Sequence, residues 1–388
     1  MLVIAGQNDI AVNAASYLKK NFSSEWAIVL NRCDLGEFSW QRSLSHYAKI
    51  NHLKIITLEQ AYQSATTFIS LEFDRIIRLE KFQREVKCFN FHFSLLPRYK
   101  GVATSVWPIL NGDKKTGVTL HEIDHGIDTG NIIAQRDYYL DENTTALDVY
   151  MKNIAIGSSL FDEKIKSLIE RTYKSFPQPS LNSSYYDKKS MDYNNREVPF
   201  NKSASQVSCF IRALTFRPFQ LATFRGNPIT RVKITKERSF QPYGKLLAET
   251  PYFFKVTTID YNVILYKDMM DNLNEFSNCT VSKATKILEG LCGINDFNEM
   301  GWNPLIVAAY NGNEEVVRML IEAGADVNAR NFKGTSALMY SKDFALSSRK
   351  KNIFNYLISK GASIYIKDWN NNSLFDYLSY NQKSWLEL

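Results

Sequence analysis

Three polar side chains of this chain are of types that can carry out chemistry together. Asn90 and His92 lie two residues apart in an apolar run typical of a buried strand, so they project from the same side of it. Asp128 lies between Gly126 and Gly130, and glycines let a chain bend back sharply. If the three converge, the imidazole can accept a proton, the amide can donate to an oxyanion, and the carboxylate can orient the imidazole. Such a set suits acyl transfer to an amine.

Each of the three side chains also has an ordinary structural explanation. Asn90 alone would cap the end of a strand, and His92 alone would be a hydrogen-bonded histidine of the core. Asp128 beside glycines would be a turn residue. The functional interpretation therefore depends on the three occurring together at fixed intervals.

The same residues belong to a longer pattern. Asn90-x-His92 is followed by Ser-Leu-Leu-Pro, by a basic turn with a tyrosine and, 36 residues after His92, by the aspartate of a Gly-Ile-Asp-Thr-Gly loop. This pattern resembles the folate-dependent formyltransferases over residues 1–265, and within them the nucleotide-sugar branch. The segments that carry the resemblance are Leu2–Val12, Asn90–His92, Ser94–Pro97, Arg98–Gly101, Trp107–Asp113, Thr116–His121, Gly126–Gly130 and Phe210–Phe219.

The resemblance implies a one-carbon transferase whose cosubstrate is N10-formyltetrahydrofolate. The acceptor would be the amine of a dTDP-linked amino-dideoxyhexose used in surface polysaccharide synthesis, such as that of lipopolysaccharide O-antigen. The sequence does not fix whether the amine is at C3 or C4, and we favour C3. By the same resemblance the pterin rests on backbone in two segments, and the residues implied are Leu71, Phe73, Asp74, Asp124, His125, Gly126 and Ile127.

Further residues are candidates for substrate binding. Cationic side chains in the basic turn could meet phosphates, a tryptophan could wall the sugar pocket, and aromatic rings could stack on a base. A solvated turn, a core tryptophan and a tyrosine-rich loop are the structural alternatives. The candidates are Arg98, Tyr99, Lys100, Trp107, Tyr186, Tyr193 and Phe216.

Composition describes an ordinary globular protein of two or three domains, with 388 residues of which 45% are hydrophobic and 22% charged. No apolar run approaches the roughly 18 residues of a membrane span, and the N-terminus lacks the features of a signal peptide. We therefore expect a cytoplasmic protein with no membrane partner. The net charge of +7 suits an anionic substrate but is too mild to indicate a nucleic-acid partner.

One motif suggests a metal site instead. His121-Glu122-x-x-His125 matches a zinc-protease signature, which needs both histidines on one face of a helix. Here Gly117–Leu120 favours a strand, and a glycine follows the second histidine directly. The five cysteines are scattered, without a Cys-x-x-Cys pair. We therefore expect no metal.

The pattern of elements predicts where a site can form. Apolar runs at 2–6, 27–31, 53–58 and 66–70 alternate with helical patterns, which indicates a Rossmann-like α/β domain with a mainly parallel sheet. In such sheets ligands bind beyond the carboxyl ends of the strands, where Asn90 and His92 lie. A helix should run from about Thr145 to Thr172, opened by a capping box of Thr145 and Asp148.

We divide the chain into a catalytic domain at 1–178, a connecting loop at 179–199, a small β-rich subdomain at 200–272 and an α-helical ankyrin repeat domain at 273–388. The ankyrin repeat domain is inferred from a repeated pattern, since Gly301-x-x-Pro-Leu recurs 33 residues later as Gly334-x-x-Ala-Leu. A degenerate third copy is displaced by 37 residues, which places four inserted residues near 347–351. So few repeats should pack against the β-rich subdomain.

The ankyrin array has several candidate roles. It could bind a protein, or Trp302 could form an accessory nucleotide-sugar site, and interdomain packing is the structural alternative. Methionyl-tRNA formyltransferase is a rival activity, but residues 200–270 are too short and not basic enough for its tRNA-binding domain. A scaffold on an inactive formyltransferase fold is a second rival, although it would not need the intact Asn90, His92 and Asp128. The resemblance also allows a homodimer.

Overall fold

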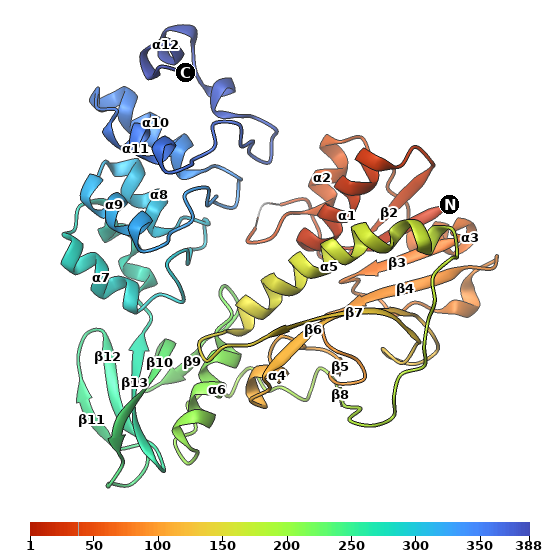
Figure 1. The fold of residues 1–388 in the computed structure, drawn as a ribbon, viewed down its shortest axis with the longest axis horizontal. Helices are drawn as coiled ribbons and strands as arrows, with labels where there is room; N and C mark the ends of the chain where they lie inside the picture. Colours follow the sequence, from red (N-terminus) through yellow and green to blue (C-terminus); the bar gives the residue numbers. More distant parts are fainter. Residues whose placement is uncertain (38) are drawn as a thin grey trace. The chain divides into compact units, whose positions relative to one another are not determined.

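The computed structural model describes residues 1–37 and 39–388, which form two compact units (Figure 1). The first unit comprises Met1–Arg196 and Arg212–Phe216, and the second comprises Glu197–Ile211 and Arg217–Leu388. The chain therefore returns briefly to the first unit before it continues into the rest of the second.

A six-stranded sheet forms the centre of the first unit, in the order β2-β1-β3-β4-β6-β7. β1 to β4 run parallel, whereas β6 and β7 are antiparallel to their neighbours. This arrangement confirms the predicted α/β architecture with a mainly parallel sheet. The strands are β1 Leu2–Gly6, β2 Trp26–Leu30, β3 Thr67–Leu71, β4 Lys87–His92, β6 Lys115–Glu122 and β7 Ile132–Tyr139, with a separate short pair of β5 Lys100–Gly101 and β8 Tyr185–Tyr186.

The apolar run at 53–58 does not form the strand that its pattern suggested. Ile55 makes a single bridge to Ile28, and helix α3 begins at Leu58. Thr57 and Gln60 form a capping box, with each side chain accepting from the other's backbone N–H. A capping box favours a helix start, and here it follows directly on the single bridge.

Helices cover both faces of the sheet (Figure 1). α1, α2 and α5 share one core with Phe89 and Phe91, and α3 shares the other with Phe68. The predicted capping box of Thr145 and Asp148 is confirmed, although α5 ends at Ile169. The helices are α1 Asn8–Asn21, α2 Leu44–Ile50, α3 Leu58–Ser64, η1 Leu79–Lys81, α4 Trp107–Leu110 and α5 Ala146–Ile169.

Alternation along β4 decides on which face the predicted site lies. Cys88 belongs to the core under α3, whereas Phe89 and Phe91 belong to the core under α1 and α5. Successive residues of a strand point to opposite faces. Asn90 and His92 therefore share the α3 side of the sheet with Cys88.

The second unit begins with an antiparallel sheet of five strands in the order β11-β12-β13-β10-β9, which confirms the predicted β-rich subdomain. Helix α6 (Ala204–Leu214) precedes the sheet and belongs to both units. The strands are β9 Ala222–Phe224, β10 Asn227–Arg238, β11 Leu246–Glu249, β12 Phe253–Thr257 and β13 Tyr261–Lys267.

Helical repeats make up the rest of this unit. Asn298, Asn331 and Asp368 occupy equivalent turns, and each accepts hydrogen bonds from the backbone N–H groups two and four residues later. α10 has 12 residues where α8 has 8, a difference of four, so the expected insertion lengthens a helix. The helices are η2 Met270–Ser277, α7 Val281–Glu289, α8 Pro304–Asn311, α9 Glu314–Glu322, α10 Ala337–Ser348, α11 Asn352–Ser359, η3 Leu374–Tyr377 and α12 Tyr380–Leu386.

A partly buried ion cluster joins the repeats to the β-rich sheet. The guanidinium of Arg217 lies 2.7 Å from Asp268 at the end of β13 and 3.1 Å from Asp296 in the first repeat turn. The side chain of Asp296 is 1% exposed. The prediction that the array packs against the β-rich subdomain is thus confirmed within this unit.

Candidate active site

The three predicted catalytic side chains meet at the carboxyl end of β4. Asp128 Oδ1 lies 3.3 Å from Asn90 Nδ2, and Asp128 Oδ2 lies 3.4 Å from His92 Nδ1. His92 is buried, and 11% of the Asp128 side chain is exposed. We call Asn90, His92 and Asp128, which the sequence predicts to be catalytic, the catalytic trio from here on.

The β6–β7 loop brings Asp128 back to β4. Gln178 Nε2 donates to the carbonyls of Asp128 and Gly130, both at 2.8 Å. A Cβ on Gly130 would lie 1.8 Å from the carbonyl oxygen of Glu122, so a larger residue cannot occupy this position without moving the loop. The bracketing glycine noted in the sequence therefore has a steric role.

The loop after β4 closes over the catalytic trio with backbone groups. The carbonyl oxygen of Tyr99 lies 2.8 Å from His92 Nε2, and the N–H of Gly101 donates to Asp128 Oδ2 at 2.9 Å. Gly101 has φ of 91°, and a Cβ there would lie 2.1 Å from the carbonyl oxygen of Tyr186. The Ser-Leu-Leu-Pro segment and the basic turn therefore contribute to the site by placing main-chain groups against the trio, as well as through their side chains.

The protonation states follow from these contacts. Burial lowers the pKa of His92, with Asp128 opposing the shift, which favours a neutral imidazole. Burial alone would raise the pKa of Asp128, but the facing imidazoles of His92 and His121 and the N–H of Gly101 lower it well below its usual range. Because a carbonyl can only accept, the Tyr99 contact assigns the His92 proton to Nε2 and leaves Nδ1 free beside the ionised Asp128.

His121 is a fourth member of this cluster that the sequence reasoning did not assign to it. It lies on β6 opposite Asn90, and its Nε2 is 3.2 Å from Asn90 Nδ2. Its Nδ1 is 2.7 Å from the carbonyl oxygen of Glu122, so Nδ1 carries the proton and Nε2 accepts from Asn90. A prediction of strand pairing that placed residues 90 and 121 opposite each other would have identified His121 as a neighbour of Asn90.

The predicted pterin-binding segments lie on either side of β4, because the strand order places β3 and β6 next to it. Leu71 is buried, Phe73 packs near Phe68, and Asp74 accepts a hydrogen bond from the N–H of Arg32. In the other segment Asp124 accepts from Gly126 and Thr129. His125, Gly126 and Ile127 are exposed.

Three of the predicted substrate residues form one aromatic stack. The rings of Trp107 and Tyr186 are 4.0 Å apart at 19°, and Tyr99 lies 5.9 Å from Tyr186. Because Tyr186 also pairs with Gly101, this stack borders the catalytic trio. Arg98 in the same turn is 2.9 Å from Asp113, so its guanidinium already has an acidic partner.

The remaining predicted residues are Phe216, Lys100, Tyr193 and Trp302. Phe216 packs against Trp40 and Tyr150. Lys100 is half-buried, and 39% of Tyr193 is exposed. In the repeats Trp302 contacts Tyr310 and Tyr340, at 5.5 and 4.8 Å between ring centroids. Phe216 therefore lies in the aromatic core of the first unit, and Lys100 lies in the loop whose neighbouring residues Tyr99 and Gly101 contact the trio.

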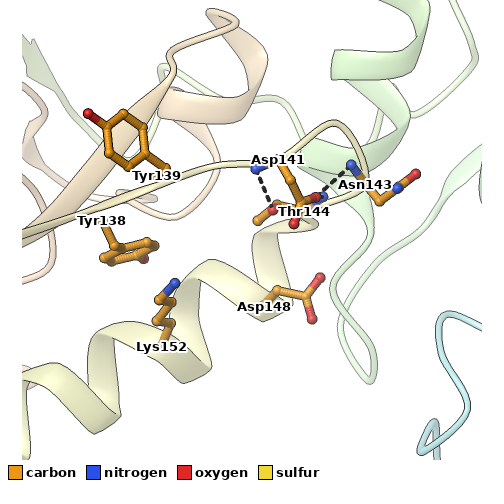
Figure 2. Close-up of a pocket in the computed structure, with 7 residues that line it drawn as sticks. All are labelled: Tyr138, Tyr139, Asp141, Asn143, Thr144, Asp148 and Lys152. Atoms are coloured by element: carbon orange, nitrogen blue, oxygen red, sulfur yellow. Dashed lines mark hydrogen bonds between the residues drawn. The ribbon is translucent and has the colours of Figure 1, made fainter. Parts of the chain in front are cut away.

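A cavity of about 270 Å³ lies between the end of β7 and the start of α5, and none of the residues that line it is a predicted site residue (Figure 2). Its polar side chains serve the local fold: Asp141 accepts from Asn143 and Thr144, and Asp148 caps α5. Lys152 lies over the ring of Tyr138 at 4.4 Å. We assign no ligand to this cavity.

The zinc-protease motif does not adopt the geometry that zinc binding needs. His121 lies on a strand with its ring directed at Asn90, and His125 lies in an exposed turn. Across residues 1–37 and 39–388, no group of three or more histidine, cysteine or acidic side chains could hold a metal ion.

No helix in the part of the chain that the structure describes is both long and apolar enough to cross a bilayer.

Comparison with known proteins defines the class. A family model for formyl transferases matches residues 56–164, and one for ankyrin repeats matches residues 277–368. An N-formyltransferase from Helicobacter canadensis, solved with folinic acid and dTDP-3-aminofucose, is 41% identical with a TM-score of 0.63, over 69% of this chain and 98% of that one. WlaRD, a sugar 3N-formyl transferase solved with dTDP and 5-N-formyl-THF, is 38% identical with a TM-score of 0.63, over 69% and 97%.

The chain belongs to the formyltransferase family and carries ankyrin repeats in addition. The curated relatives are more distant. The methionyl-tRNA formyltransferase of Clostridioides difficile is 32% identical over 47% of this chain, and the chain spans 59% of that protein's length. The resemblance inferred from the motifs is therefore confirmed at the level of the family.

Proposed function

We propose that this protein transfers the formyl group of N10-formyltetrahydrofolate to the C3 amine of a dTDP-linked amino-dideoxyhexose, for surface polysaccharide synthesis. The observation that carries the proposal is the catalytic trio, in which a neutral imidazole adjoins an ionised carboxylate and an amide. Two relatives that this chain covers almost completely were solved with folates and with dTDP or a dTDP-3-amino sugar. They support the cosubstrate, the nucleotide and the C3 position.

His92 and Asp128 act on the proton of the attacking amine. His92 Nε2 faces the Tyr99 carbonyl, so Nδ1 is the nitrogen that can accept a proton. Once protonated, the imidazolium lies 3.4 Å from the Asp128 carboxylate, which stabilises its charge. A positioned base of this kind contributes about 10²–10⁴-fold in rate.

Asn90 acts on the formyl oxygen, where negative charge grows during the attack. Its amide donates to Asp128 and His121 over 3.3 and 3.2 Å, and bonds of this length are weak. One N–H can therefore turn to the oxyanion with little loss. Removal of one such donor costs on the order of 3 kcal/mol in the transition state.

An assay of tetrahydrofolate release tests the proposal. Full-length protein is supplied with N10-formyltetrahydrofolate and, in parallel, with a dTDP-3-amino sugar, a dTDP-4-amino sugar or charged initiator tRNA. We expect turnover with the 3-amino sugar at least tenfold above the other two. Faster turnover with the 4-amino sugar would overturn the C3 assignment, and turnover with tRNA alone would establish the rival activity. Silence with all three would favour the inactive scaffold.

The aromatic cluster in the repeats is the basis of a second candidate function. Trp302 is half-buried, and Tyr310 beside it is 43% exposed. We propose that this cluster forms an accessory site for a nucleotide sugar. Titration of an Asp128→Asn variant with the dTDP-sugar should then show two binding events, one of which Trp302→Ala abolishes. A single event that Trp302→Ala leaves unchanged would refute the accessory site.

A further inference from the structure

Tyr99, in the loop after β4, has an unusual backbone conformation next to the catalytic trio. Its φ of 60° lies in the left-handed region, which residues with a side chain seldom occupy unless the surrounding contacts hold them there. Its carbonyl oxygen lies 2.8 Å from His92 Nε2. The contacts that hold Tyr99 in this conformation therefore also place an acceptor against the imidazole.

The phenol of Tyr99 is held by three polar side chains. Its hydroxyl donates to Asp113 Oδ2 at 2.6 Å and accepts from Asn111 Nδ2 at 3.1 Å. Arg98 Nη2 donates to the same hydroxyl at 2.8 Å and to Asp113 Oδ1 at 2.9 Å. A hydroxyl has one hydrogen to donate and two lone pairs that accept, so this group is fully used. Asp113 is the member that both accepts the phenol proton and pairs with the cation.

The main chain around Tyr99 is fixed as well. Its N–H donates to Ser184 Oγ at 2.8 Å, and the preceding carbonyl, that of Arg98, accepts from Ser94 Oγ at 2.7 Å. Tyr99 is 3% exposed, and its ring lies at 29° to that of Tyr186. The carbonyl of Tyr99 therefore cannot turn away from the imidazole without breaking several of these contacts.

Two acceptors face the single proton of the neutral His92 ring. Asp128 Oδ2 lies 3.4 Å from Nδ1, and the Tyr99 carbonyl lies 2.8 Å from Nε2. N–H···O hydrogen bonds extend to about 3.2 Å, so only the Tyr99 contact has the length of a normal bond. Across residues 1–37 and 39–388, Nε2 has no other hydrogen-bond partner. The tautomer of His92 therefore depends on Tyr99.

Loss of the Tyr99 contact would reverse the tautomer. An ionised carboxylate is a stronger acceptor than a carbonyl, so without the carbonyl the proton would move to Nδ1 and bond to Asp128. Nδ1 would then carry a hydrogen and could not take the proton of the amine. Asp128, which stabilises protonated His92 during the reaction, would in this case hold the ring in an inactive form.

We propose that Asp113 is a positioning residue for formyl transfer. By holding Tyr99, it keeps the proton of His92 on Nε2 and so leaves Nδ1 free to accept the proton of the attacking amine. This role rests on the proposed function. Arg98 and Tyr99, which the sequence suggested as substrate residues, contribute in this role to the orientation of the imidazole.

The pH profile supplies a signature of this role. Burial lowers the pKa of His92, Asp128 on the β6–β7 loop and the Tyr99 carbonyl raise it, and His121 on β6 lowers it. Loss of the carbonyl contact removes one of the two interactions that raise the pKa, so the pKa should fall. Because His92 acts as a base, the acid limb of the kcat/KM profile should then lie at lower pH than in the wild type.

NMR of the full-length protein with ¹⁵N-labelled imidazoles tests the tautomer directly. The chain has five histidines, and the protonated and unprotonated nitrogens of a neutral ring have distinct shifts. The signal of His92 is assigned by its loss in His92→Asn. We expect the proton on Nε2 in the wild type and, in at least part of the molecules, on Nδ1 in Asp113→Ala. Asp137→Ala, at an exposed ion pair with Lys115, is the matched control and should leave the tautomer unchanged.

Formyl transfer to a dTDP-3-amino sugar is measured on the same variants. In Asp113→Ala and Tyr99→Phe, kcat should fall about tenfold, the equivalent of one hydrogen bond, while KM for the sugar changes by less than about twofold. Asp113→Asn keeps an oxygen that can accept the phenol proton and should recover most of the rate. Asp137→Ala should be as active as the wild type.

The outcomes separate the two proposals. In an active enzyme, a His92 proton that stays on Nε2 in Asp113→Ala, or a KM that rises while kcat holds, would overturn the positioning role alone. If the wild type does not formylate the dTDP-sugar, the proposed function fails, yet a proton that moves to Nδ1 in the variant would still establish that Asp113 sets the tautomer. Should Asp113→Ala not fold, Tyr99→Phe decides by the same two measurements, because it keeps the ring that stacks on Tyr186.

Discussion

Polar side chains are used differently at the catalytic trio and in the turns of the ankyrin repeats. In the turns, Asn298, Asn331 and Asp368 bond to backbone two and four residues away, and the pattern repeats from turn to turn. At the trio, Asp128 accepts hydrogen bonds from Asn90 and Gly101, the first of them long, and faces the free Nδ1 of His92 at 3.4 Å. The turns show that a polar residue bonded within its own loop builds the fold. At the trio, residues gathered from distant segments make long contacts, so their donors and acceptors are not all committed to holding the fold.

The ion cluster of Arg217, Asp268 and Asp296 limits this comparison. Its members are also distant in sequence, yet their contacts of 2.7 and 3.1 Å are short and Asp296 is buried. Distance in sequence therefore does not by itself mark a site. The distinguishing property is a group that keeps a donor or acceptor free, as His92 does at Nδ1.

The largest effect should come from Asp128→Asn. It keeps the shape of the side chain but removes the charge that stabilises protonated His92, so kcat for formyl transfer should fall about 10³-fold. Circular dichroism and folinic acid binding should confirm that the protein remains folded. Residual activity within tenfold of the wild type would mean that the trio is not the reacting centre.

Asp296→Ala should give the next largest effect, on stability rather than rate. It leaves the Arg217 guanidinium without one of its two carboxylate partners, and breaking a buried pair costs about 3 kcal/mol. Hydrogen exchange at amides of β13 and α8 would measure this loss. The exposed Asp271→Ala in the same unit serves as control. Equal protection in both variants would show that the cluster does not hold the repeats to the sheet.

Substitutions of His121 would show whether the orientation of the Asn90 amide can be changed separately from the chemical step. His121→Leu removes the acceptor that orients the Asn90 amide, so kcat should fall about 10–50-fold, equivalent to one lost hydrogen bond to a positioned group, with KM nearly unchanged. His121→Gln can restore an acceptor near Nε2 and should recover part of the rate. Equal rates in the two variants would assign His121 a packing role.

The smallest effect should come from Asn331→Ala. Loss of the two hydrogen bonds from Lys333 and Thr335 should lower the free energy of unfolding of the second unit by about 1–2 kcal/mol. Formyl transfer should stay within twofold of the wild type. Urea titration and the tetrahydrofolate assay would measure the two quantities. A large loss of activity with unchanged stability would contradict the conclusion that the polar residues of the repeat turns stabilise the fold and those of the trio do not.

The sequence was sufficient to predict a structural feature wherever the pattern that indicates the feature is local or periodic. The Asn-x-His spacing, the capping box at Thr145 and the 33-residue repeat each predict a feature that the structure shows. The sequence was insufficient to predict contacts between side chains that depend on how strands pair or how a loop folds. His121 meets Asn90 through the β4–β6 register, and Arg98 meets Asp113 through the fold of its loop. The run at 53–58 failed because apolar composition alone does not separate a strand from the approach to a helix.

The bond from Gly101 to Asp128 has a consequence for mutational scanning of this protein. The donor is a main-chain amide, which no exchange of side chains removes. Every substitution at that position would instead register as a folding defect, because a Cβ meets the Tyr186 carbonyl. A scan would therefore class Gly101 as structural and overlook its electrostatic contribution, which only replacement of the amide by an ester would expose.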